Sequence, residues 1–305
     1  MINRLLSTPV TLLLLMSLLL MSAASAEVIE EQRSLYQKVF MVEENGMRCM
    51  RFKKRSTRNF SQSCIYLADR ELFVFDYYKQ AMAATFFVKQ PAEILVIGLG
   101  GGVLAGTFGE LFPQANITSV EIDPVVVKMA HKYFDYSDEA DNITTVVQDG
   151  RVFVKRALKK GRRFDLVILD AFSSDYIPEH MLTREFLEEV KTVLADHGLL
   201  VANTFSASKL FNHESTTYQA VFGEFYQVRF TGMDVSRVII ASNQKLPDIS
   251  SLLPRVNQVR GMLQPLGVDA LSLYSSISSE VNWDIKARIL TDQYSPANLL
   301  NSGSR

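Results

Sequence analysis

Through the middle of this chain, short apolar segments alternate with segments of helical character, and this alternation narrows the choice of fold more than any other feature. The apolar segments are Leu-, Ile- and Val-rich, as in strands buried on both faces. Such alternation predicts an α/β fold with a doubly wound, mostly parallel sheet. The expected strands are 94–97, 117–122, 143–147, 166–169 and 199–202, and the expected helices are 103–111, 124–134, 151–160 and 184–195. An antiparallel pair at 226–230 and 237–241 is expected to complete the sheet.

A smaller β-rich unit is expected before this region. Segments 34–42 and 47–52 are rich in β-forming residues and flank Asn45-Gly46, a dipeptide that favours the positive φ angles of a tight hairpin turn. A third strand is expected at 64–67, and the apolar and aromatic segment 72–88 favours a helix leading into the main domain.

The sequence thus divides into three parts. These are a leader at 1–26, a β-rich module at 27–70 and the main α/β domain at 71–300.

The leader has the composition of a secretory signal. Arg4 precedes the apolar run 10–21, and the small residues Ala24-Ser25-Ala26 form a cleavage pattern just before Glu27. The run is shorter than the roughly 20 residues that cross a bilayer. We therefore predict export, to the periplasm. The alternative is an uncleaved leader that anchors the protein, which would be its one association with a membrane.

Export changes the interpretation of Cys49 and Cys64, the two cysteines of the chain. An oxidising compartment permits a disulfide between them, and the alternative is two small buried thiols. With only four histidines besides, and neither a CxxC nor an HExxH motif, we expect no bound metal. The formal charge is −1, which supplies no global field for nucleic acid, so we expect no nucleic-acid partner.

The expected strand 94–97 leads directly into Gly98-Leu99-Gly100-Gly101-Gly102, and Val103 then begins a helix. Glycines let a turn pass closely under a ligand, and a helix start offers N–H groups that lack intrahelical partners. A tight strand-to-helix turn is the alternative explanation and needs no ligand.

Three further strands end in acidic residues. Glu121 ends the second strand, where ribose hydroxyls are bound in such folds, while Asp149 ends the third and Asp170 the fourth. The carboxyl ends of parallel strands share one edge of the sheet, so these side chains should line one ligand site. Helix caps and turns are the alternative roles for acidic residues at these positions.

Motifs along the chain resemble those of the spermidine synthase (polyamine aminopropyltransferase) family, in particular its divergent bacterial spermidine synthase-like branch. They are GLGGG, VEIDP, DGRVF, FDLVILDAFSSDYIP and LTREF, followed by LTDQYSP near the end of the chain. The resemblance implies a Rossmann-like fold of the class I S-adenosylmethionine-dependent transferase type. It also implies a homodimer formed through the N-terminal module.

The resemblance assigns roles to individual residues. Gly98, Gly100 and Gly102 would surround the sulfonium side of the donor nucleoside. Glu121 would bind the ribose, and Asp149 with Gly150 would recognise adenine. The catalytic residue would be Asp170, which accepts a proton from the attacking amine. Further substrate-binding candidates are Asp175, in the loop that closes the site, Tyr78 and Asp292.

The implied reaction transfers an aminopropyl group from decarboxylated S-adenosylmethionine to an amine acceptor. One feature favours a different donor, because the family's glycine loop usually contains an aspartate that holds the donor ammonium, and Gly98–Gly102 contains none. A neutral loop at a helix start suits the carboxylate of intact S-adenosylmethionine, which favours a methyltransferase. A non-catalytic nucleoside- or polyamine-binding protein is the third hypothesis.

Overall fold

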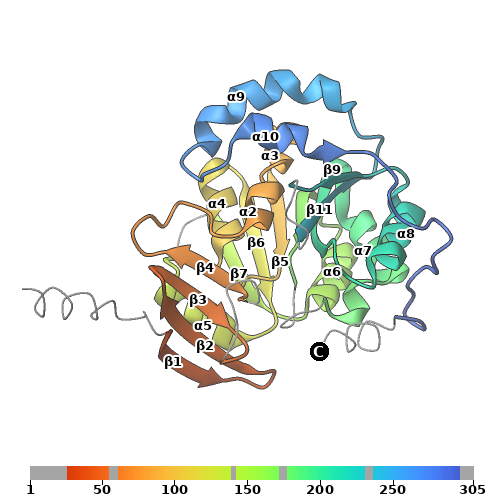
Figure 1. The fold of residues 1–305 in the computed structure, drawn as a ribbon. Coiled ribbons are helices and arrows are strands. Elements are labelled where there is room, and N and C mark those ends of the chain that lie inside the picture. Colours follow the sequence, from red (N-terminus) through yellow and green to blue (C-terminus); the bar gives the residue numbers. More distant parts are fainter. Residues whose placement is uncertain (1–25, 55–60, 139–141, 172–176, 231–235, 296–305) are drawn as a thin grey trace, which may run out of the picture.

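The computed structural model describes residues 26–54, 61–138, 142–171, 177–230 and 236–295. Two sheets organise them, a four-stranded antiparallel sheet near the N-terminus and an eight-stranded mixed sheet (Figure 1). The predicted leader and the candidate Asp175 lie outside the described residues.

The small sheet has the order β1-β2-β3-β4 and is antiparallel throughout. Its strands are β1 Glu27–Arg33, β2 Lys38–Glu44, β3 Met47–Arg51 and β4 Ser63–Tyr66. The predicted hairpin turn is confirmed, because Asn45 and Gly46 have φ angles of 50° and 73°. The strand expected at 34–42 starts later, since Ser34 N–H donates to the Gln37 carbonyl and closes a turn there. The strand β1 had no counterpart among the predicted strands.

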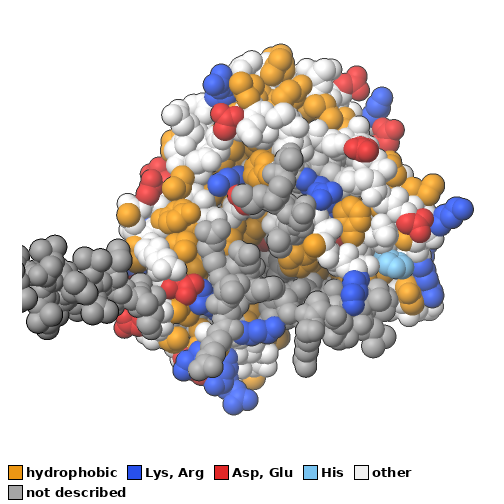
Figure 2. All heavy atoms as spheres, in the orientation of Figure 1, with side chains coloured by type: hydrophobic (Ala, Val, Ile, Leu, Met, Phe, Trp, Pro, Cys, Tyr) orange, Lys and Arg blue, Asp and Glu red, His pale blue; other side chains and the backbone are white. Residues whose placement is uncertain are grey.

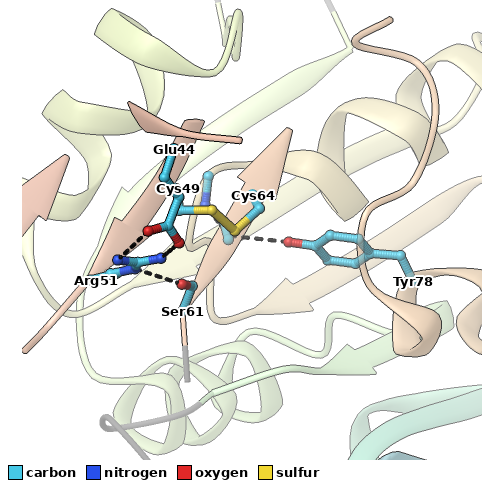
Figure 3. Close-up of a disulfide and its surroundings, with 8 residues drawn as sticks. Glu44, Cys49, Arg51, Ser61, Cys64 and Tyr78 are labelled. Atoms are coloured by element: carbon cyan, nitrogen blue, oxygen red, sulfur yellow. Dashed lines mark hydrogen bonds and ion pairs between the residues drawn. A yellow bond between two sulfur atoms is a disulfide. The ribbon is translucent and has the colours of Figure 1, made fainter. Parts of the chain in front are cut away.

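A disulfide joins Cys49 to Cys64, which are direct partners in the pairing of β3 with β4 (Figure 3). The disulfide prediction is therefore confirmed over the alternative of two thiols. Arg51, the last residue of β3, is almost entirely buried and pairs with Glu44 and Ser61.

The large sheet has the order β12-β10-β11-β9-β8-β5-β6-β7. Its strands are β5 Glu93–Ile97, β6 Asn116–Glu121, β7 Ile143–Val147, β8 Phe164–Leu169, β9 Leu194–Phe205, β10 Tyr226–Val228, β11 Ser236–Ser242 and β12 Ile277–Ser278. Pairing from β9 through β8, β5 and β6 to β7 is parallel, and β10, β11 and β12 add antiparallel pairs. The predicted doubly wound, mostly parallel fold is confirmed.

Helices cover both faces of this sheet (Figure 1). They are α2 Asp76–Ala81, α3 Ala84–Phe87, α4 Val103–Leu111, α5 Pro124–Tyr133, α6 Gly150–Lys159, α7 Arg184–Val193, α8 Phe211–Phe222, α9 Leu253–Leu263 and α10 Ala270–Ser275, with short 3₁₀ turns at Glu179–Met181 and Ile249–Leu252. One apolar core packs α4 and α9 against the sheet, and a second packs α6 and α7 against its other face. A third, smaller core joins α5 to the N-terminal sheet, so the two sheets are held together by apolar contact.

The single helix expected at 72–88 is wrong, because two short helices, α2 and α3, occupy that segment. The break falls at Met82 and Ala83. The Thr85 hydroxyl donates to the Met82 carbonyl at 2.8 Å, a local bond that competes with continued helix.

The surface seen in Figure 2 carries acidic and basic side chains dispersed among apolar ones. Among the described residues, no helix combines the length and the hydrophobicity that crossing a membrane requires.

Candidate functional site

A cavity of about 300 Å³ opens at the carboxyl edge of the parallel strands. The large sheet supplies most of its wall, and the N-terminal module supplies Tyr36, Gln37, Phe52 and Gln62. The site therefore lies between the two sheets. It is lined by Tyr36, Gln37, Phe52, Gln62, Tyr77, Ile97, Gly98, Gly100, Val120, Glu121, Ile122, Val126, Asp149, Gly150, Asp170, Ala171, Pro178, His180 and Met181.

The glycine loop combines positive φ angles with close packing. Gly98 has φ 93°, and a Cβ there would lie 2.3 Å from the Asp170 carbonyl oxygen, so only glycine lets the loop cross the end of β8. Gly98 and Gly100 line the cavity, as predicted. Gly102, the third glycine of the prediction, is not among the residues that line it. A Cβ at Gly102 would meet the Tyr136 ring at 2.3 Å, so this glycine serves helix packing.

Glu121 projects from the end of β6 into the cavity wall. One carboxylate oxygen accepts the Leu99 N–H at 3.0 Å, and the other accepts the Asp123 N–H at 3.0 Å. Burial raises the pKa of Glu121, while these two backbone donors oppose the rise. The residue thus ties the glycine loop to the second strand and presents a carboxylate to a ligand.

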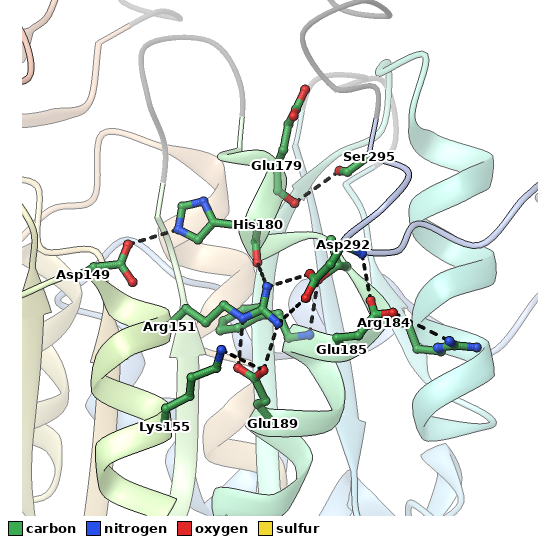
Figure 4. A network of polar contacts seen from close by, with 12 residues as sticks. Asp149, Arg151, Lys155, Glu179, His180, Arg184, Glu185, Glu189, Asp292 and Ser295 are labelled. Atoms are coloured by element: carbon green, nitrogen blue, oxygen red, sulfur yellow. Dashed lines mark hydrogen bonds and ion pairs between the residues drawn. The ribbon is translucent and has the colours of Figure 1, made fainter.

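Asp149 and Gly150 line the cavity at the start of α6. Asp149 Oδ1 accepts the Val152 N–H at 2.9 Å and so caps the start of α6. The other carboxylate oxygen, Oδ2, lies 3.0 Å from His180 Nε2 (Figure 4). The contact with His180 lowers the pKa of Asp149. His180 follows the segment 172–176 and was not among the predicted site residues, but it lines the cavity.

Asp170 follows β8 and occupies the centre of the polar wall. Its Oδ1 accepts Asn203 Nδ2–H at 2.8 Å, and its Oδ2 accepts the Tyr77 hydroxyl at 3.2 Å. Burial raises the pKa of Asp170 to about 7, and the nearby Glu121 charge adds to the rise while both hydrogen bonds oppose it. The segment 172–176, which a cap or turn at Asp170 would involve, lies outside the described residues. A carboxyl poised near neutral pH suits proton transfer.

Two predicted substrate-binding residues lie elsewhere. Tyr78 is 1% exposed and donates to Ser63 Oγ behind the wall, while its neighbour Tyr77 lines the cavity. Successive helical residues point about 100° apart, so only one of the two rings can face the site. Asp292 does not line the cavity either. It accepts two hydrogen bonds from Arg151 and one from Thr183 (Figure 4).

Asn203 and Tyr77 are site residues that sequence reasoning missed. Asn203 comes directly after the predicted strand 199–202, so the rule that found the acidic strand ends applies to it as well. Tyr77 had no comparable signal, since an aromatic residue in an apolar segment is ordinarily a core residue.

The described lining of the cavity carries mainly acidic side chains. Glu121, Asp149 and Asp170 all line it, and its described lining includes no lysine or arginine. His180 is the one lining residue described there that can carry positive charge, and it faces Asp149. A cavity lined by acidic side chains favours a cationic ligand over a ligand whose own carboxylate must be bound.

Comparison with known proteins gives relatives that are named as aminopropyltransferases and others that are named as protein methyltransferases. A spermine/spermidine synthase domain matches residues 76–233. The chain is 42% identical over 281 residues to a polyamine aminopropyltransferase of Vibrio vulnificus, an alignment that covers 92% of this chain and 93% of the relative.

Two solved structures share the fold. A probable spermidine synthase from Corynebacterium glutamicum superposes with TM-score 0.63 and 19% identity, over 85% of this chain and 97% of the other. Human methyltransferase-like protein 13, in complex with SAH, superposes with TM-score 0.54 and 22% identity, over 73% of this chain and 99% of the other. Both therefore carry the sheet and helix arrangement described above.

Proposed function

Because this chain belongs to the spermine/spermidine synthase family and is an aminopropyltransferase, we propose that its donor is decarboxylated S-adenosylmethionine and its acceptor a small di- or polyamine. The family match and the 42% identity to the Vibrio vulnificus enzyme support the transferase class. The choice of substrates within that class rests on the site itself.

The charge of the cavity is the observation that carries this choice. Decarboxylated S-adenosylmethionine bears a sulfonium and an ammonium, and a di- or polyamine acceptor is also cationic at neutral pH. The three carboxylates of Glu121, Asp149 and Asp170 match these charges. Intact S-adenosylmethionine adds a carboxylate, for which the described lining offers no arginine or lysine. The lack of an aspartate in the glycine loop was the one feature that favoured methyl transfer. The negative charge of the cavity lining as a whole is the stronger argument, and it favours aminopropyl transfer.

The chemistry assigned to the chain's own residues is simple. The acceptor nitrogen forms a bond to the propyl carbon next to sulfur, the carbon–sulfur bond breaks, and its electron pair leaves with a neutral thioether. The amine proton passes to the Asp170 carboxylate, which Asn203 and Tyr77 hold in position. The leaving thioether needs no acid, so the protein contributes alignment and exclusion of water.

Turnover with both donors tests the proposal. We expect the purified protein to convert decarboxylated S-adenosylmethionine and an amine from a panel of diamines into methylthioadenosine and an aminopropylated amine, both identified by mass spectrometry. The matched control is intact S-adenosylmethionine with the same panel, which should give no methylated amine. Methyl transfer would overturn the proposal in favour of a methyltransferase. Calorimetric binding without turnover on any amine would establish the non-catalytic alternative.

We also propose that the protein is exported and that its leader is removed. The Cys49–Cys64 disulfide supports this, because disulfides persist in oxidising compartments. Mass spectrometry of the N-terminus of protein from a periplasmic fraction should find Glu27 as the first residue. An intact leader in a membrane fraction would indicate the anchored alternative. The homodimer stays a prediction, which light scattering of the mature protein can test.

A further inference from the structure

We propose that Asp292, in the C-terminal segment 290–295, is a positioning residue for the donor nucleoside. It acts through Arg151, whose guanidinium holds the 3₁₀ turn Glu179–Met181 in the wall of the cavity. This role rests on the proposed function, because it takes the nucleoside to lie at the Asp149 end of the cavity. It also explains a residue that the sequence singled out and that is not among those lining the cavity.

The turn Glu179–Met181 lies directly against the start of α6. His180 and Met181 line the cavity, as do Asp149 and Gly150. His180 Nε2 lies 3.0 Å from Asp149 Oδ2, and a Cβ at Gly150 would lie 3.2 Å from the Met181 methyl carbon. A shift of the turn therefore moves two lining side chains away from the two residues assigned to the adenine.

Arg151 connects this turn to the C-terminal segment. Its Nη1 donates to the His180 carbonyl at 3.3 Å and to Asp292 Oδ1 at 2.6 Å, and its Nη2 donates to Asp292 Oδ2 at 2.8 Å (Figure 4). Glu189, on α7, accepts from Nε at 2.9 Å and from Nη2 at 2.8 Å. Because Nη1 bonds both Asp292 and the His180 carbonyl, the carboxylate fixes the group that holds the turn.

Asp292 is itself held in place. Its Oδ1 also accepts the Thr183 hydroxyl at 2.7 Å, and its N–H donates to Glu185 Oε2 at 3.0 Å. The hydrogen bonds from Arg151 lower the pKa of Asp292, so the pair is charged at neutral pH. The Arg151 side chain is 10% exposed, which shields these charge-assisted bonds from part of the solvent.

The rest of the segment 290–295 is anchored on both sides of this contact. Leu290 is completely buried, and its carbonyl accepts the Arg184 N–H at 2.8 Å. At the other end, the Ser295 hydroxyl donates to the Glu179 carbonyl at 3.2 Å, which is a contact with the turn itself (Figure 4). The segment thus joins α7 to the turn, and Asp292 supplies its charged contact.

Loss of the Asp292 charge should loosen the turn without unfolding the chain. Arg151 keeps Glu189 as a counter-ion, so no buried charge is left alone. Its Nη1, however, loses the acceptor that aims it at the His180 carbonyl. His180 and Met181 are then held less firmly, and the cost appears as weaker binding of the nucleoside.

Asp292→Asn tests this role, because it keeps the shape of the side chain and removes its charge. We expect the Kd for methylthioadenosine, measured by calorimetry, to rise roughly tenfold, within the usual range of coupling between separate sites. The Kd for decarboxylated S-adenosylmethionine should rise by the same factor, since both ligands carry the same nucleoside. A Kd for methylthioadenosine within about twofold of the wild type would overturn the inference.

Steady-state kinetics separate positioning of the donor from contact with the acceptor. In Asp292→Asn the KM for the donor should rise, while kcat and the KM for the amine stay within about twofold of the wild type. A rise in the KM for the amine alone would make Asp292 an acceptor-binding residue and would overturn the inference.

Glu93→Gln is the matched control, because it breaks an ion pair of similar exposure at the opposite end of β5 from the cavity. Glu93 lies 3.2 Å from Arg162, and its side chain is 34% exposed, against 45% for Asp292. Urea unfolding should show a small loss of stability in both variants, whereas the Kd for methylthioadenosine should change in Asp292→Asn alone. Equal rises in Kd would show a general effect of weakened folding and overturn the inference.

A second measurement uses the wild type alone. Coupling between two sites is reciprocal, so a nucleoside that binds better because of Asp292 must also stabilise the contacts of Asp292. The Asp292 N–H donates to Glu185, the Tyr294 N–H donates to the Thr291 carbonyl, and neither donor residue lines the cavity. Saturating methylthioadenosine should therefore slow hydrogen exchange in peptides that cover 290–295. Unchanged exchange would overturn the inference.

Failure of the proposed function is a separate result. Methylthioadenosine reports binding of the nucleoside whichever group is transferred, so its Kd and the exchange rates test the role of Asp292 directly. The proposed function fails if the wild type transfers no aminopropyl group.

Discussion

Asp170 and Glu214 are two carboxyl groups of this molecule that share one property. Burial raises the pKa of each to about 7. Two adjacent residues of β9 connect to these carboxyl groups. Asn203 donates a hydrogen bond to Asp170. Thr204 accepts a hydrogen bond from Arg237, which is the partner of Glu214. Successive strand residues point to opposite faces, so the two groups belong to opposite sides of the sheet.

Their surroundings differ in kind. Glu214 is 3% exposed and lies 2.9 Å from the guanidinium of Arg237, which is itself fully buried and stacks over Phe211. Within the part of the chain that the structure describes, the hydrogen-bond partners of Asp170 are the neutral Asn203 and Tyr77, and Asp170 lines the cavity. A raised pKa therefore does not distinguish a catalytic carboxyl from a structural one. The distinction comes from an open path to ligand and from the absence of a bound cation.

The largest effect is expected at Asp170. Replacing it in Asp170→Asn keeps the shape but removes the proton acceptor, so kcat should fall by roughly 10³-fold, within the range for loss of a general base. The Kd for methylthioadenosine should stay within about twofold of the wild type. Steady-state kinetics and calorimetry measure the two quantities, and near-normal kcat would show that another group takes the proton.

The same variant should be more stable than the wild type at alkaline pH. Because folding raises the pKa of Asp170 from 3.8 to about 7, its ionisation costs stability, and that cost builds up between these two pH values and is complete above about 7. Asp170→Asn removes the cost, so its Tm should exceed that of the wild type by on the order of 5 °C at pH 8 and by less at pH 5. If the Tm difference between Asp170→Asn and the wild type is the same at pH 8 and pH 5, the ionisation of Asp170 does not cost stability.

Glu214→Gln should have the opposite effect. It leaves the Arg237 charge buried without its counter-ion, and breaking a buried pair in this way costs about 3–5 kcal/mol. Urea unfolding should show this loss of free energy, while kcat at 25 °C should stay close to the wild-type value because Glu214 lines no part of the cavity. A variant as stable as the wild type would show that Arg237 does not need the Glu214 charge. A folded but inactive variant would show that Glu214 contributes to activity. Either result would contradict the difference drawn between the two carboxyl groups.

The smallest effect is expected from Asn203→Ala. With Asp170 as a base, kcat/KM of the wild type should rise with pH and level off above about 7, since the ionised carboxyl is the active form. Asn203 lowers that pKa by its hydrogen bond, so its loss should move the rising limb upward by about 1 pH unit. A pH–rate profile that does not move would separate Asn203 from the protonation of Asp170.

Much of the site was accessible from the sequence because it depends on strand ends. Parallel strands finish at one edge, so the sequence predicts that Glu121, Asp149 and Asp170 converge, and all three line the cavity. The Asn45-Gly46 turn was predictable for a similar reason, since positive φ angles are a property of the residues themselves.

Other residues depended on docking between distant segments. Which of Tyr77 and Tyr78 faces the ligand is decided by the rotation of one short helix against the sheet. Gly102, predicted to bind ligand, is instead a glycine because Tyr136 packs against it. Neither fact is encoded in a local pattern.

The parallel strands with their acidic ends and the Asn45-Gly46 turn were thus determined by the sequence alone, because these features follow from residue preferences over a few positions. Only the tertiary structure decided that Ser63 of one sheet caps the loop of the other, and that Glu214 is neutralised by Arg237 while Asp170 is left facing the cavity. The physical reason is that both results arise where separate elements meet, and the energy of such contacts depends on distances that no short stretch of sequence specifies.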